Sequence, residues 1–149
     1  MTTLIAYKKA GLKFERLEEM EAGIELFGHE VKSIREKLGQ LDGSHVVVRG
    51  GEAYLMGATI PAYQPGNTPL SYDPERTRRL LLKKSEIAQL ADAEAKKGLT
   101  VVPIELYNKN NLIKVRVAIV RGKGKSDKRE DLKRKDAKRE AARVLKRKI

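Results

Sequence analysis

Residues 99–120 read LTVVPIELYNKNNLIKVRVAIV, two apolar segments joined by four polar residues. In the second segment, Ile and Val at every other position alternate with polar positions that include Lys114 and Arg116. This period of two is typical of a strand with one buried face, so Lys114 and Arg116 predict a basic wall on the other face. Residues 108–111 supply turn-forming Asn side chains and predict an antiparallel hairpin. The two predicted strands cover residues 99–107 and 112–120.

Further strands are predicted on the N-terminal side of this hairpin. Gly50 and Gly51 separate two apolar runs, and glycine at both central positions favours a tight two-residue hairpin because both accept positive φ. Pro103 lacks a backbone N–H, so its strand is predicted to lie at a sheet edge or to carry a bulge. The predicted strands are residues 4–7, 14–27, 46–48, 54–56 and 80–82, with a loop at residues 61–74.

Two short helices are predicted between the strands. Residues 29–38 have apolar side chains at i, i+3 and i+7, which indicates one buried helix face and leaves Glu30 and Ser33 pointing mostly away from the core. Ser85 is a suitable N-cap for a second helix at residues 86–97.

About six antiparallel strands and two short helices predict a mainly β fold. The natural candidate is a small antiparallel barrel of the oligonucleotide-binding type, with peripheral short helices and a basic C-terminal tail. The length of 149 residues allows one domain. We expect residues 1–121 to form the body and residues 122–149 the tail. A generic α+β sandwich is the alternative, because the number of strands does not separate the two.

The tail concentrates the positive charge of the chain. Residues 122–149 contain thirteen Lys and Arg against five Asp and Glu, a net charge of +8 out of +12 for the whole chain. Acids lie one turn before bases, as in Glu130 and Arg134, which supports a helix. The apolar residues are too few to bury a helix face. We therefore expect a tail that is disordered when free and helical on a polyanionic partner, with Gly122 and Gly124 as its hinge.

Composition limits the classes of partner. A pI near 9.9 with few aromatic residues favours a nucleic acid. A membrane surface is not expected, because the tail has no Trp or Phe to oppose its basic residues. The absence of Cys, of a long apolar run and of a signal-peptide core predicts a cytoplasmic protein. We expect it to be a monomer when free.

Residues that carry chemistry are scarce. His29 and His45 are the only His residues and Cys is absent, which disfavours a zinc site or a Cys nucleophile. Residues 124–126, GKS, resemble the end of a phosphate-binding loop, but Ile119 stands where that loop requires Gly. The sequence therefore predicts a binding protein and not an enzyme, with no catalytic residue, no metal and no cofactor.

Four motifs occur in an order and spacing that resemble the SsrA-binding protein (SmpB) family, the protein partners of transfer-messenger RNA. The resemblance runs from about Ile5 into the tail. The motifs are residues 21–24 (EAGI), 28–35 (GHEVKSIR), 76–82 (RTRRLLL), and 122–123 (GK) followed by 127–130 (DKRE).

The resemblance implies a closed barrel of the oligonucleotide-binding type with peripheral helices. It also implies binding to the tRNA-like part of transfer-messenger RNA and entry into stalled bacterial ribosomes. There the tail would take the place of the missing codon–anticodon pairing in the small-subunit decoding centre, and the incomplete nascent chain would be tagged for degradation.

Matching the family's functional positions to this sequence gives two groups of site residues. The RNA-binding residues are Glu21, Leu81 and Lys83, with the adjoining Lys8, Lys9 and Arg78 as phosphate contacts. The tail residues for the decoding centre are Lys123, Asp127, Lys128 and Arg129.

Three residues depart from the pattern that the resemblance implies. Tyr7 stands where Asn is common, and Lys83 occupies a position that can be Asn or His. Ser126 lacks the aromatic or His ring often found just before the Asp-Lys-Arg run, so it is not expected to stack on a ribosomal base.

Two alternatives within RNA binding stay open from the residues alone: a ribosomal protein and a generic single-strand binder. Generic single-strand binders stack bases on exposed aromatic side chains, and this chain has two Phe and five Tyr. The series of motifs favours the SmpB family over both.

Overall fold

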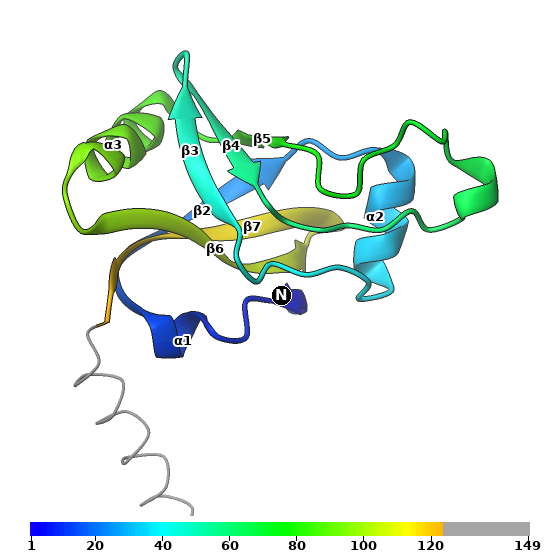
Figure 1. Cartoon of the computed structure of the whole chain (residues 1–149), viewed down its shortest axis with the longest axis horizontal. Helices are drawn as coiled ribbons and strands as arrows, with labels where there is room; N and C mark the ends of the chain where they lie inside the picture. Colours follow the sequence, from blue (N-terminus) through cyan, green and yellow to red (C-terminus); the bar gives the residue numbers. More distant parts are fainter. Residues whose placement is uncertain (124–149) are drawn as a thin grey trace, which may run out of the picture.

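Within residues 1–123, which the computed structural model describes, seven antiparallel strands form one sheet (Figure 1). Their order in the sheet is β1-β6-β7-β2-β5-β4-β3. The predicted mainly β architecture is confirmed. The strands are β1 (Thr2–Ala6), β2 (Phe14–Ile24), β3 (His45–Arg49), β4 (Glu52–Met56), β5 (Arg78–Leu81), β6 (Leu99–Lys109) and β7 (Leu112–Gly122).

The two outer strands of this order are β1 and β3. In the described part of the chain, no backbone pairing joins β1 to β3, so the sheet is open and the closed barrel is not confirmed. The sheet is nevertheless curled, because β3 contacts β6 although the two strands are not paired. Residues of β1 and of the segment 37–42 line a common hollow at this side of the sheet.

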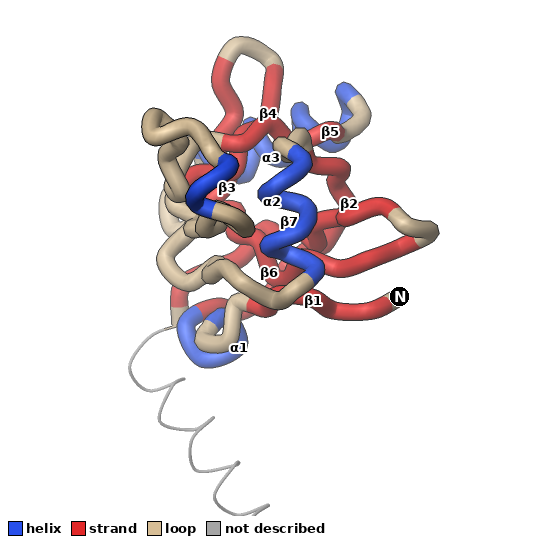
Figure 2. Tube along the Cα trace, turned by 90° about the vertical axis from the view of Figure 1, so that its right-hand side faces the viewer, coloured by secondary structure: helices blue, strands red, loops and turns tan. Residues whose placement is uncertain are grey.

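Short helices surround the sheet (Figures 1 and 2). α3 and α2 lie at opposite ends of the sheet, and α1 lies below it next to the end of β7 (Figure 1). The predicted helices are therefore present, with boundaries shifted by a few residues. The helices are α1 (Ala10–Lys13), α2 (Gly28–Arg35), α3 (Lys84–Ala95) and the 3₁₀ turn η1 (Pro65–Asn67).

The hairpin of β6 and β7 forms the centre of the sheet and much of the core. Its turn is made by Asn110 and Asn111, with φ of 51° and 63°. Asn tolerates this left-handed conformation, which two-residue hairpin turns require. The turn is thus shorter than the predicted residues 108–111, and both strands are correspondingly longer.

The predicted faces of β7 are confirmed over its first half. Val115 and Val117 are fully buried, whereas Lys114 and Arg116 are partly exposed. From Ala118 to Val120 both faces are buried, so Ala118 is a core residue too.

Pro103 causes a bulge, which was one of its two predicted roles. The register between β6 and β7 shifts between Pro103 and Glu105. Its strand lies between β1 and β7, so the edge position is wrong and the bulge is confirmed.

The hairpin of β3 and β4 turns at Gly50 and Gly51, as predicted. Their φ values are 60° and 77°, which only glycine adopts without strain. The free edge of β3 is partly covered by α3, because Glu94 accepts hydrogen bonds from the backbone N–H of Val48 at 3.1 Å and from Arg49 at 2.7 Å.

The second helix starts before the predicted cap. α3 begins at Lys84, so Ser85 lies inside the helix and Lys83 is the N-cap. The carboxylate of Glu86 accepts a hydrogen bond from the Lys83 backbone N–H at 3.0 Å. This side chain supplies the N-terminal cap that was predicted for Ser85.

Candidate nucleic-acid interface

The outer face of the sheet brings residues of three strands, β2, β5 and β7, together. The register places Glu21 of β2 opposite Arg116 of β7, and Gly23 between Lys114 and Leu81. Because side chains alternate along a strand, these residues share the face opposite the buried core.

Glu21 is held in place by two residues of β6. Its carboxylate accepts a hydrogen bond of 2.5 Å from the Tyr107 hydroxyl and contacts the Lys109 ammonium at 3.2 Å. The Tyr107 hydrogen bond, followed by Lys109, lowers the pKa of Glu21. Burial, followed by the hydrogen bond to Glu21, raises the pKa of Tyr107. The carboxylate therefore stays ionised and keeps one orientation.

Arg116 does not contribute to a purely basic wall. Its guanidinium lies 3.7 Å from Glu19 and from Glu105, and 5.3 Å from the centre of the Tyr107 ring. The predicted basic wall of Lys114 and Arg116 is corrected to a surface of mixed charge, because β2 and β6 place carboxylates beside Arg116.

Leu81 lies across Gly23 and remains 47% exposed. A Cβ atom added to Gly23 would lie 3.1 Å from the Cβ of Leu81, so the missing side chain makes room for Leu81. Lys83 follows two residues later and is exposed. Glu21, Leu81 and Lys83 thus lie on connected elements.

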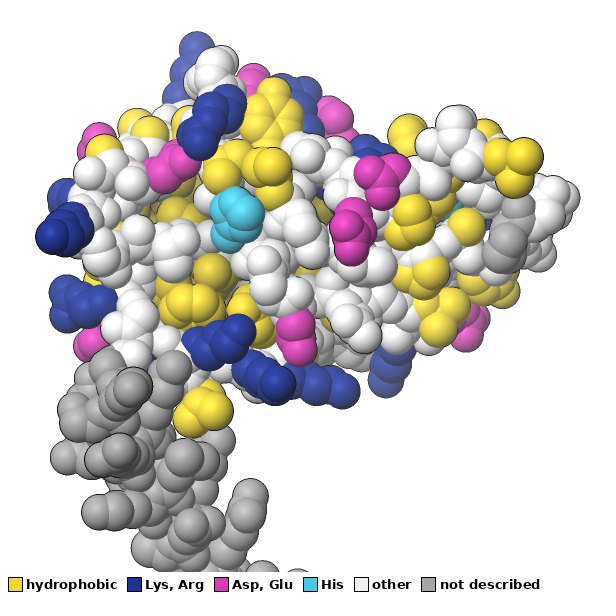
Figure 3. Space-filling view, viewed as in Figure 1, with side chains coloured by type: hydrophobic (Ala, Val, Ile, Leu, Met, Phe, Trp, Pro, Cys, Tyr) yellow, Lys and Arg dark blue, Asp and Glu magenta, His cyan; other side chains and the backbone are white. Residues whose placement is uncertain are grey.

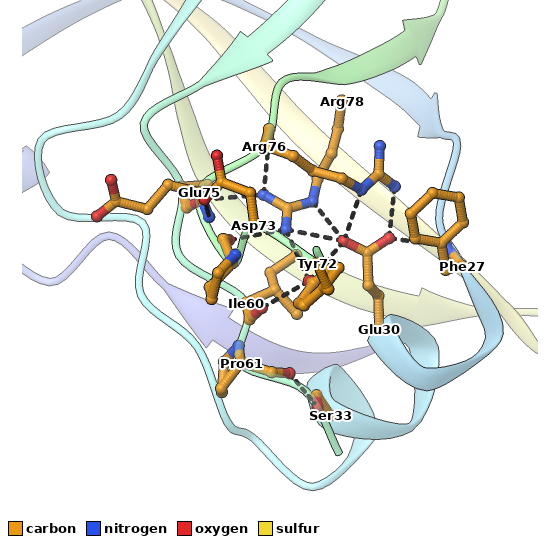
Figure 4. A network of polar contacts seen from close by, with 12 residues as sticks. Phe27, Glu30, Ser33, Ile60, Pro61, Tyr72, Asp73, Glu75, Arg76 and Arg78 are labelled. Atoms are coloured by element: carbon orange, nitrogen blue, oxygen red, sulfur yellow. Dashed lines mark hydrogen bonds and ion pairs between the residues drawn. The ribbon is translucent and has the colours of Figure 1, made fainter. Parts of the chain in front are cut away.

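The structure contradicts the prediction that Arg78 contacts a phosphate. It is fully buried, and its guanidinium lies 2.8 Å from Glu30 and donates to the carbonyls of Ala58 and Pro74, each at 2.9 Å (Figure 4). It also donates to the Tyr72 hydroxyl at 3.2 Å. A phosphate contact requires exposed donors, so Arg78 is a structural residue.

Glu30 and Ser33 also differ from the prediction, since both are fully buried. Ser33 donates to the Pro61 carbonyl at 2.6 Å, and Arg76 donates to Glu30 from above the Phe27 ring (Figure 4). Burial opposes the charge of Glu30, but hydrogen bonds from Arg76, the Phe27 backbone and Arg78 lower its pKa to about 2. One feature of the sequence could have indicated that Glu30 points inward. It lies three residues after Phe27, the N-cap of α2, which is the position of the acid in a capping box.

Lys8 and Lys9 lie in the turn before α1, at the other side of the body from β5 in both views (Figures 1 and 2). Both are exposed. Figure 3 shows Lys and Arg side chains in a row along the lower edge of the body. The predicted RNA-binding residues therefore form two separate areas rather than one.

The tail starts beside these lysines. Lys123 donates from its backbone N–H to the Lys13 carbonyl at 2.8 Å and from its ammonium to the Gly11 carbonyl at 2.9 Å. Gly122 pairs with Phe14 as the last residue of β7, so Gly122 is not a hinge. The remaining predicted tail residues, namely Gly124, Ser126, Asp127, Lys128 and Arg129, lie outside the described residues.

Tyr7 belongs to the core and not to the surface. It is 5% exposed, and its ring meets Phe14 edge to face at 6.1 Å. His29 is half-buried and packs edge to face against Tyr72, with 4.5 Å between the ring centres.

Over residues 1–123, no group of His, Asp or Glu side chains is arranged to hold a metal ion. None of the helices described is long and apolar enough to cross a membrane. An antiparallel sheet with a charged outer face, exposed lysines and a basic C-terminal segment defines a β protein of the nucleic-acid-binding class.

Comparison with known proteins identifies the family. The model of the SmpB protein family matches residues 4–147, so the chain belongs to the SmpB family. The SsrA-binding protein of Chelativorans sp. (strain BNC1) is 44% identical over 147 residues, covering 98% of this chain and 94% of the relative. That of Thermosipho africanus (strain TCF52B) is 43% identical, covering 99% of both chains.

A solved structure has the same fold. Its description reads "tmRNA-SmpB: a journey to the center of the bacterial ribosome". The matching chain has a TM-score of 0.68 and 36% sequence identity, covering 86% of this chain and 93% of the other.

Proposed function

We propose that this chain is an RNA-binding protein that binds the tRNA-like part of transfer-messenger RNA and delivers it to stalled ribosomes. Incomplete nascent chains are then tagged in trans-translation. The observation that carries this proposal is membership of the SmpB family over residues 4–147, together with the 36% identity to a chain described with tmRNA and the bacterial ribosome. The role is therefore one of binding, and its place is the cytoplasm, where ribosomes act.

The RNA-binding area on the outer face consists of Glu21, Leu81 and Lys83. Its support is geometric, since an ionised carboxylate in a fixed orientation lies near an exposed apolar side chain. RNA offers ribose hydroxyls and base amino groups to such an acceptor, and unstacked bases to an apolar platform. Lys8 and Lys9 contact phosphates from the second area.

The tail acts separately, in the small-subunit decoding centre, through Lys123, Asp127, Lys128 and Arg129. Its support is the position of Lys123, which the contacts to Lys13 and Gly11 fix at the end of β7. We propose that residues after Lys123 are disordered in the free protein and become helical on the ribosome.

In this proposal, the curled sheet corresponds to a barrel of the oligonucleotide-binding type. The contact between β3 and β6 supports this view, as does α3, which packs against both strands. The unpaired side between β1 and β3 then corresponds to the gap in a partly open barrel.

The test is to identify the RNA that copurifies with the full chain from its own cells. We expect one dominant RNA of the transfer-messenger type, bound with an affinity that falls as salt rises, because phosphate contacts release counterions. Bulk ribosomal or messenger RNA without this species would contradict the proposal.

A further inference from the structure

A surface hollow of about 350 Å³ lies between the free edge of β1 and residues 37–42. It is distinct from the outer face that carries Glu21 and Leu81. β1 contributes backbone and apolar side chains, and two lysines and two other polar residues face it from outside the strand. The lining residues are Leu4, Ile5, Ala6, Lys8, Lys37, Gly39, Gln40 and Asp42.

The lysines of this hollow have no polar partner among residues 1–123. Lys8 and Lys37 are exposed, and within residues 1–123 neither ammonium makes a hydrogen bond or an ion pair. Two cations of the outer face, Lys109 and Arg116, are instead paired with carboxylates. Two unpaired ammonium groups at one hollow attract an anion.

The backbone of the hollow is preformed. Gly39 lies so close to β1 that an added Cβ would be 2.9 Å from Ile5 Cδ1 and 3.0 Å from the Thr59 carbonyl. Gln40 and Thr59 exchange backbone hydrogen bonds of 2.9 and 3.0 Å. These contacts fix the loop against the strand, so a ligand does not have to order it.

Lys37 is itself in an unfavourable conformation. Its φ is 60°, in the left-handed region that glycine or Asn adopts more readily than Lys. Glycine would adopt this conformation more readily, and the lysine side chain makes no hydrogen bond or ion pair within residues 1–123 to offset the difference. The conformation belongs to the end of α2, because the backbone N–H of Lys37 donates to the Ile34 carbonyl and that of Leu38 donates to the Ser33 carbonyl, each at 2.9 Å.

We propose that this hollow binds the backbone of RNA, with Lys8 and Lys37 on one phosphate and with Gln40 and Asp42 facing the adjoining ribose. The inference rests on the proposed function and adds Lys37 to its phosphate contacts. A polymer fits better than a small anion, because the exposed Lys9 directly follows Lys8 and offers a second cation next to the hollow. Asp42 is accommodated because a carboxylate accepts a hydrogen bond from a ribose hydroxyl.

The test compares Lys37→Gly with Lys97→Gly in the full chain. Lys97 is a matched control, since it is also an exposed lysine in a turn without a partner in the described part of the chain. Lys37→Gly is expected to weaken RNA binding roughly five- to tenfold at 0.1 M salt and to reduce the salt slope by about 0.7–0.9. Lys37→Arg retains the charge and should bind like the wild type.

Two binding measurements distinguish the two RNAs that could supply the phosphate. One measures binding to the tRNA-like RNA, and the other measures binding to isolated small ribosomal subunits. A loss in either arm supports the hollow and assigns its partner, whereas equal binding of Lys37→Gly and Lys97→Gly in both arms overturns it. The thermal midpoint of Lys37→Gly should equal or exceed that of the wild type, because glycine suits the backbone.

A different binding pattern is expected if the proposed function itself is wrong. If the wild type prefers neither the tRNA-like RNA nor small subunits over unrelated RNA, the function is wrong. The difference in salt slope between the two glycine variants, measured on that unrelated RNA, then still decides whether the hollow binds phosphate.

Discussion

The hydroxyl of Tyr107 donates a 2.5 Å hydrogen bond to the carboxylate of Glu21 and joins the middle of β2 to β6 across β7. Tyr107 is 1% exposed, whereas Glu21 is exposed. A buried donor thus fixes an acceptor that faces solvent. The carboxylate is ready to receive a hydrogen bond from a ligand without first losing conformational freedom.

Replacement Tyr107→Phe removes this donor and little volume. We expect the pKa of Glu21 to rise and the free energy of unfolding to fall by about 1 kcal/mol. Carboxyl ¹³C titration and urea unfolding measure the two effects. An unchanged pKa would show that Lys109 alone determines the ionisation of Glu21.

Replacement Glu21→Gln separates a functional carboxylate from a merely solvated one. A solvated Glu repels RNA, so its loss would tighten binding slightly. A Glu that accepts hydrogen bonds from the RNA is only partly replaced by Gln, so we expect weaker binding. Filter binding at fixed salt gives the sign, with Glu15→Gln as the control on the same strand. Tighter binding by Glu21→Gln would remove Glu21 from the interface.

The replacement Gly23→Ala tests whether RNA binding depends on the position of the Leu81 side chain. The new methyl group would lie 3.1 Å from Leu81 Cβ and 3.3 Å from its Cδ1, so Leu81 must move by a few tenths of an ångström. We expect a several-fold loss of RNA affinity with a loss of stability near 1 kcal/mol. Gly11→Ala is the control, because no atom lies within 4 Å of its added Cβ. Equal affinities of the two variants would separate the position of Leu81 from RNA binding.

Acid should destabilise the body through Glu30. Its pKa is lowered on folding from 4.5 to about 2. Its stabilising contribution is therefore complete above about pH 4.5 and is lost as the pH falls toward 2. The expected loss is about 3 kcal/mol. Urea unfolding of the wild type between pH 2 and pH 7 measures it.

Glu30→Gln provides the comparison, because an amide does not titrate in this range. It leaves the Arg78 charge buried without its anion, so we expect a loss of about 3–5 kcal/mol at neutral pH. Its stability should then depend less on pH between 4.5 and 2 than that of the wild type. Parallel pH profiles of the two proteins would mean that another carboxylate is responsible.

Replacement of Asp127, Lys128 and Arg129 together by Ala changes the net charge by about one unit. We expect RNA affinity to stay near that of the wild type and tagging of stalled chains to be abolished. A tail that acts only through its charge predicts little effect of this triple substitution. A chain whose residues 124–149 are scrambled is the control, and tagging at the native rate by this chain would contradict a specific tail.

Local signals predicted the hairpins well. The glycine pair at residues 50 and 51 and the alternation in residues 112–117 each lie within a few residues, and the structure confirms both. The family was predictable for a similar reason, because each of its four motifs is a short run of consecutive residues and their order is read directly along the chain.

Charge pairing was the part that the sequence could not reveal. Arg78 and Glu30 are 48 positions apart, and only the fold shows that they form one buried ion pair. Arg116 was predicted to be part of a basic wall because the carboxylates beside it come from β2 and β6. Such pairings depend on the order of strands in the sheet, which the spacing of residues in the chain does not determine.

β7 links the two functions of the chain through one rigid element. Arg116 and Lys114 lie on its outer face beside Glu21, and its last residue, Gly122, directly precedes the fixed Lys123. Eleven residues of extended strand span roughly 36 Å. If RNA binds this face as we propose, the strand sets a constant distance and direction between the bound RNA and the point from which the tail departs.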